Sequence, residues 1–116
     1  MPSEAQHLRK ADGNQRFAES LNLAQDPNAE WAIVALFYAA VHRIEAVLAR
    51  DFNLHSLNHE QRKKTMARIG TMRTCFLEYA HLETLSRNCR YEAKLFKLAD
   101  YQKARPIFDK FRSILK

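Results

Sequence analysis

The stretch that most constrains the fold is Trp31–Val41, WAIVALFYAAV, in which every side chain is apolar or aromatic. A helix that is apolar on all sides has to be covered on all sides by other parts of the protein. Beyond this run the pattern becomes one-sided, with Ile44 and Val47 set against charged neighbours. The run itself is too short to cross a bilayer. The sequence therefore predicts a central helix over residues 27–50 and no membrane contact.

The rest of the chain is poor in residues that form turns, with 2 Gly and 3 Pro among 116 residues. Few strands are expected, and the hydrophobic spacing favours helices. Ser3 with Gln6, and Asn58 with Gln61, have the spacing of a capping box at a helix start. Further helices are expected over residues 3–24, from His59 (short and basic), over 72–97, and from Asp100 as cap to the end, with Pro106 kinking or restarting the last one. We predict one all-α domain over residues 1–116, a four- to five-helix up-down bundle.

The N-terminus, MPSEAQHLRK, has no apolar segment of the kind that a secretory signal requires. Cys75 and Cys89 are fourteen residues apart in one expected helix. Such a separation is a rise of about 21 Å, too far for a disulfide. Free thiols and a polar N-terminus predict a cytoplasmic protein.

The net charge of +6 is concentrated in the second half of the chain. Residues 59–97 hold nine basic side chains and four acidic ones, whereas residues 1–30 hold three and five. A basic half favours a polyanionic partner, most often nucleic acid. The alternative is an ordinary soluble bundle with a basic, solvated surface.

Three histidines and their neighbours are candidates for proton transfer. Tyr38, His42 and Glu45 fall along one strip of the central helix, where Glu45 could hold an imidazole nitrogen. The alternative for His42 is a buried histidine that is satisfied within the bundle. His55 and His59 have a spacing that could bind a metal, but no cysteine or second carboxylate near them completes a ligand set. We therefore expect no metal site and no cofactor.

A phosphate-contacting edge fits these loop histidines better, because the basic residues Arg62, Lys63 and Lys64 follow them. A histidine beside an RNA phosphodiester can act as general acid or base. The alternative is that His59 lies in the first helical turn and His55 is simply solvated.

A second basic group lies in LSRNCRYEAK, residues 85–94. Its residues Arg87, Arg90, Tyr91 and Lys94 share one helical face, where arginine could clamp phosphate and tyrosine could stack on a base. Glu83 could instead pair with Arg87 as neighbours on the helix. No glycine-rich phosphate loop, nucleophile elbow or paired carboxylate signature is present.

Together, WAIVALFYAAVHRIEAVLA, HSLNHEQR and LSRNCRYEAK resemble small prokaryotic HEPN domains (higher eukaryotes and prokaryotes nucleotide-binding), over residues 14–115. The resemblance implies a helical bundle, often a symmetric homodimer, that in active members cleaves RNA without metal. The ribose 2′-OH attacks the adjacent phosphate while Arg and His stabilise charge and move protons. Many such proteins belong to toxin–antitoxin, phage-defence or CRISPR-linked systems.

Active members of that family carry an arginine followed a few residues later by a histidine on a late helix. Here only Arg50 and His55 have that spacing, and they lie at the end of the central helix. Two hypotheses follow. A variant ribonuclease would use His42, His55 or His59 with Arg87 and Arg90 on the phosphate. A non-catalytic module would bind nucleic acid or a protein partner passively, as an adaptor or subunit of a larger complex.

Overall fold

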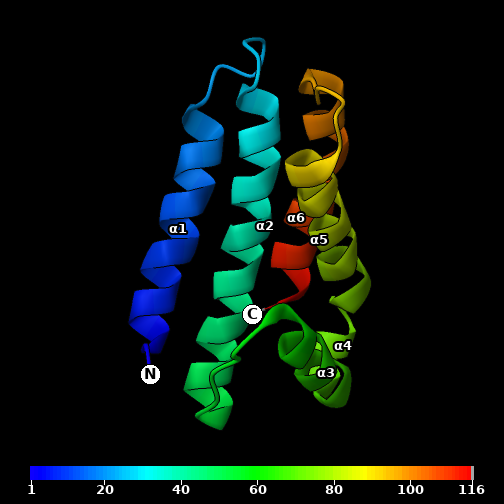
Figure 1. The fold of residues 1–116 in the computed structure, drawn as a ribbon. Coiled ribbons are helices and arrows are strands. Elements are labelled where there is room, and N and C mark those ends of the chain that lie inside the picture. Colours follow the sequence, from blue (N-terminus) through cyan, green and yellow to red (C-terminus); the bar gives the residue numbers. More distant parts are fainter. Residues whose placement is uncertain (116) are drawn as a thin grey trace.

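The computed structural model describes residues 1–115, and these form a bundle of α-helices without strands, which confirms the all-α prediction. Figure 1 shows the long helices lying side by side, with the shorter helices at the lower end of the view. The elements are α1 (Glu4–Ser20), α2 (Asn28–Val47), a π-helical turn η1 (Leu48–Phe52), α3 (His59–Arg68), α4 (Gly70–Arg73), α5 (Phe76–Tyr91) and α6 (Leu98–Ile114).

Helix α2 is the core of the bundle, as its apolar sequence predicts. It packs against α1, α5 and α6 (Figure 1), and side chains such as Ile33, Leu36 and Phe37 are completely buried. Residues 28–52 are long and apolar enough to cross a membrane, but 72% of their most apolar stretch is buried inside the protein. This burial is what the central helix of a bundle shows, because its neighbours cover the apolar surface. Trp31, near the start of α2, departs from this burial, with 54% of its surface exposed.

Helix α1 is shorter than expected. It ends at Ser20, and its Ser3–Gln6 capping box is formed as predicted. The buried face consists of His7, Ala11 and Ala18, whereas Phe17 is 50% exposed. Small alanines on this face let the two helices approach closely, so the buried polar residue His7 meets α2 directly.

The single helix expected over residues 72–97 is wrong at both ends. Its first turn is the separate helix α4, and Cys75 precedes α5 in a non-helical conformation. At the other end α5 stops at Tyr91, and residues 92–97 form an irregular segment before α6. Phe96 is buried there, and its backbone N–H donates to the Glu30 carboxylate at 2.9 Å. The free energy gained by burying Phe96 against the core outweighs the free energy that further helical turns would contribute.

Helix α6 begins earlier than Asp100 and is not broken. Lys97 is the capping residue, and its backbone N–H donates to the Asp100 carboxylate at 2.8 Å. The helix continues through Pro106 to Ile114. Pro106 and Gln102, one turn before it, are both exposed, so the carbonyl that loses its helical donor can be solvated.

Candidate functional site

A buried ion pair joins α2 to α3 at the end of the bundle where the N-terminus lies. Nε of Arg62 donates to Oε2 of Glu45 at 2.7 Å, and the side chains are only 8% and 2% exposed. The sequence prediction that Arg62 contacts RNA is therefore wrong, because its guanidinium faces the interior. A buried carboxylate needs a partner of opposite charge. Helix α3 begins at His59, so Arg62 lies one turn into the helix, next to Glu45.

The other oxygen of Glu45 holds the loop that precedes α3. Oε1 accepts the backbone N–H of Ser56 at 2.9 Å, and Nδ1 of His55 lies 3.4 Å from the same atom. Burial alone raises the pKa of Glu45, but hydrogen bonds from Ser56 and Arg62 outweigh burial and hold its pKa below the ordinary value. Glu45 is thus an anion at neutral pH, and it fixes the loop that presents His55.

His59 lies on the opposite side of Arg62. Nη1 of Arg62 donates to Nδ1 of His59 at 2.8 Å, and the hydroxyl oxygen of Tyr79 lies 3.4 Å from the same Nη1. The His59 ring also packs against Phe37, with ring centroids 5.5 Å apart. Burial, and then the charge of Arg62, lowers the pKa of His59 from its ordinary value of 6.5. Burial has the opposite effect on Tyr79, whose pKa it raises to about 12.

A histidine that the sequence reasoning did not select completes the cluster. Nδ1 of His7 lies 3.1 Å from Nδ1 of His42, and the His7 ring stacks on His55 with centroids 5.8 Å apart. Burial is the main cause that lowers the pKa of both His7 and His42. The signal in the sequence was the spacing of His7, Ala11 and Ala18, which puts a histidine on the small-residue face of its helix.

The Glu45–Arg62 ion pair therefore links His55 to His59, because His55 contacts Glu45 and His59 contacts Arg62. Within residues 1–115 no hydrogen bond joins the two histidines directly. His42, His7 and His55 lie on the Glu45 side, and His59 lies on the Arg62 side. We name these residues with Glu45 and Arg62 the histidine cluster. The predicted strip of Tyr38, His42 and Glu45 is the face of α2 on which the histidine cluster is built.

Only part of the predicted basic face on α5 is formed. Arg90 reaches the Tyr38 hydroxyl at 3.3 Å, and its guanidinium lies 5.3 Å from the Tyr91 ring centroid. Lys94 lies beyond the helix end, so it does not share that face, and it packs over Phe96 instead. Arg87 is exposed on α5.

Two lysines that precede this face are engaged in ion pairs. Lys63 binds Glu83 at 2.8 Å, so the alternative pairing of Glu83 with Arg87 is not formed. Lys64 binds Glu60 at 3.2 Å, and both side chains are mostly exposed. Because the Tyr38 and His59 rings lie 6.3 Å apart, Arg90 sits beside the histidine cluster.

A groove next to Arg90 exposes aromatic surface between α2 and the end of α5. It measures about 350 Å³ and is lined by Glu30, Trp31, Val34, Cys89, Arg90 and Tyr91. Tyr91 is 75% exposed and Trp31 54%. Both cysteines of the chain are free, as predicted, and both are buried. Burial raises the pKa of Cys75 to about 11 and that of Cys89 to about 12. The thiols are therefore neutral and not reactive nucleophiles.

A scan of the chain against models of protein families gives no match, and searches of curated proteins and of solved structures give none either.

Proposed function

We propose that this protein is a HEPN-like domain that binds and cleaves RNA without metal, with His55 and His59 as the proton-transfer groups. The observation that carries the proposal is the position of His55, in the loop before α3, and of His59, the first residue of α3. Each is held by one member of the buried Glu45–Arg62 pair, yet His55 is exposed and His59 is only partly buried. A histidine whose ring is held by a buried partner and is still accessible to a substrate from solvent suits general acid–base catalysis.

In the proposed reaction, the ribose 2′-oxygen attacks the neighbouring phosphorus while one histidine takes the 2′-OH proton. The bond from phosphorus to the 5′-oxygen breaks, and the other histidine gives a proton to that leaving oxygen. The products are a 2′,3′-cyclic phosphate and a 5′-hydroxyl. His55 is suited to be the base, because a proton on Nδ1, beside the Glu45 oxygen, leaves Nε2 with a free lone pair. His59 is suited to be the proton donor, because its Nδ1 accepts from Arg62 and its Nε2 therefore carries the proton.

Positive charge next to these histidines would hold the RNA and stabilise the phosphate during the reaction. Arg90 lies beside the cluster through its contact with Tyr38, and Lys63 follows Arg62 on α3, half-buried and paired with Glu83. Tyr91 and Arg87 extend this surface along α5, and Lys64 and Lys94 flank it. Arg62 acts differently, since it positions His59 from inside the protein.

The proposal includes a homodimer, a cytoplasmic location and a role in a prokaryotic defence or toxin system, as the HEPN resemblance implies. The dimer is tested by light scattering of the purified protein over a range of concentrations. A protein partner from the same system would be an additional component, tested by co-purification of the two chains expressed together.

The catalytic proposal is tested by incubating labelled single-stranded RNA with the protein in EDTA. We expect the wild type to cut the RNA and the His55→Ala/His59→Ala variant to be inactive. His81→Ala is the matched control, because His81 is an exposed histidine on α5 outside the cluster. Cleavage that survives in the double variant would contradict the assignment of these histidines.

A second candidate function is a non-catalytic binding module, and the aromatic groove favours it. Trp31 and Tyr91 expose ring surface beside the Arg90 guanidinium, an arrangement on which an unpaired base can stack. This candidate predicts that the wild type binds single-stranded RNA in EDTA without cutting it. It also predicts that Trp31→Ala lowers the affinity whereas His55→Ala/His59→Ala does not.

A further inference from the structure

The buried nitrogen Nε2 of His7 has no hydrogen-bond partner within residues 1–115. The residue is only 4% exposed, so surface water does not supply one freely. An unpaired polar atom in a protein interior is costly, and in native proteins it commonly marks the position of a bound group. Nε2 of His7 is therefore the starting point of the inference.

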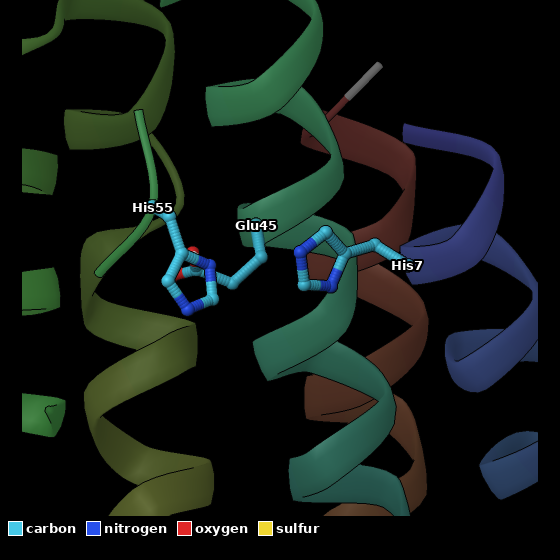
Figure 2. A group of neighbouring side chains, drawn as sticks. All are labelled: His7, Glu45 and His55. Carbon is cyan, nitrogen blue, oxygen red and sulfur yellow. The ribbon is translucent and has the colours of Figure 1, made fainter. Parts of the chain in front are cut away.

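This nitrogen belongs to a set of three groups that can bind a metal. One nitrogen from each of His7 and His55 and a carboxylate oxygen of Glu45 all lie within 4.8 Å of one another. Figure 2 shows the His7 side chain, from α1, and the His55 side chain, from the loop, both directed toward the Glu45 side chain of α2. The sequence could not show this set, because its members come from three separate elements.

The groups around this set hold the ligands in the form that a metal requires. When Nδ1 of His7 carries the proton and donates to Nδ1 of His42 at 3.1 Å, Nε2 carries a free lone pair. Burial lowers the pKa of His7, which keeps the imidazole neutral. The Ser56 N–H and the Arg62 guanidinium hold the Glu45 carboxylate at 2.9 and 2.7 Å. Such outer contacts are typical of metal-binding histidines and carboxylates.

We infer that His7, Glu45 and His55 form a binding site for one zinc-class divalent cation, with Nε2 of His7, one carboxylate oxygen and Nδ1 of His55 as ligands. Two imidazoles and one carboxylate favour zinc or cobalt over magnesium or calcium, which prefer oxygen ligands. The exposed side of His55 leaves the fourth position to water.

Binding requires the three groups to move closer. Ligands of a tetrahedral zinc ion lie about 2.0–2.2 Å from the metal, and therefore roughly 3.3 Å from one another. His55 can supply this movement, because it lies in the irregular segment between η1 and α3 and its side chain is 37% exposed. Arg62 neutralises part of the Glu45 charge, so the two imidazoles have to provide most of the affinity.

The cation would engage the same His55 that we propose as a proton-transfer group. It would then inhibit RNA cleavage, and this consequence rests on the proposed function. Metal binding itself does not, because it can be measured without RNA.

The test is a titration of the metal-free full-length protein with Co²⁺, followed by visible absorption, and with Zn²⁺, followed by calorimetry. We expect one equivalent of each metal to bind, with the absorption of a tetrahedral nitrogen–oxygen site. His55→Ala, at an exposed position, and His7→Gln should each weaken binding at least about 10-fold, because the loss of an outer-shell partner alone already costs about that much. Zn²⁺ should raise the melting temperature of the wild type but not that of His55→Ala.

His81→Ala is the matched control, since it removes an exposed histidine on α5 outside the ligand set, and it should bind as the wild type does. Three results would overturn the inference: no binding by the wild type, binding that His55→Ala leaves unchanged, or thiolate-to-cobalt absorption that places the metal on Cys75 or Cys89. If Zn²⁺ binds as expected but RNA is not cleaved in EDTA, the metal site stands and the ribonuclease proposal fails.

Discussion

Nε of Arg62 donates to Oε2 of Glu45 at 2.7 Å inside the protein, and the histidine cluster is arranged around this contact. The pair joins α2 to α3, orders the loop through Ser56, and touches His55 and His59 on its two sides. The positions of His55 and His59, which we propose to act at the surface, therefore depend on the buried Glu45–Arg62 pair.

Removing the carboxylate charge should destabilise the protein strongly. Glu45→Gln leaves the Arg62 guanidinium buried without its counter-charge, and breaking a buried pair in this way costs about 3–5 kcal/mol. The free energy of unfolding, measured with urea, checks this expectation. Glu60→Gln is the control, because the exposed pair of Glu60 with Lys64 should contribute little. Equal stability of the two variants would show that the Glu45–Arg62 pair does not hold the fold.

The stability of the protein should fall as the pH decreases from 7 toward 5. Burial lowers the pKa of His7, His42 and His59 from 6.5 in the folded state, so the unfolded chain binds more protons in this range. Protonation therefore favours unfolding, beginning near pH 6.5. At lower pH the depressed pKa of Glu45 adds to the loss, because its contribution is complete above the ordinary pKa of a glutamate and is lost as the pH falls toward the lower pKa of the folded state.

Melting temperatures of the wild type and of His7→Gln/His42→Gln across this pH range test the assignment. The variant should show a flatter dependence between pH 7 and pH 5.5, whatever its stability at pH 7. An unchanged slope would show that other groups cause the pH dependence.

Two aromatic residues of α2 should contribute very differently to stability. Phe37 is fully buried, so Phe37→Ala should cost about 3–5 kcal/mol, whereas Trp31→Ala should cost much less because Trp31 is 54% exposed. Urea unfolding of the two variants gives this comparison. Trp31 is also the only tryptophan of the chain, so the fluorescence of the folded protein should have the red-shifted maximum of a solvated indole.

RNA binding should weaken when Arg90 loses its charge. Removing one cation that neutralises a phosphate of a single strand lowers the slope of log affinity against log salt by about 0.7, and Arg90→Gln should show a change of this size. Fluorescence anisotropy with labelled RNA at several salt concentrations measures it. Arg16→Gln removes the same charge from an exposed position on α1, away from the cluster, and should leave the slope unchanged. The same slope in both variants would contradict an RNA-binding surface at Arg90.

Much of the fold could be predicted, because it depends on local patterns. The all-apolar run of α2, the caps at Ser3 and Asn58 and the start of α3 at His59 are properties of neighbouring residues. The end of α5 was missed, since it depends on the burial of Phe96 and its contact with Glu30. No short stretch of sequence contains both partners of that contact.

Local sequence patterns are enough to specify a helical bundle around α2, with basic residues concentrated in the second half of the chain. These properties follow from composition and helical periodicity, which act over a few residues. Tertiary packing was needed to establish that Arg62 faces inward, that Trp31 faces outward and that His7 joins His42 and His55. The physical reason is that helix rotation and loop path are set by long-range packing and by the need of the buried Glu45 for partners from distant segments.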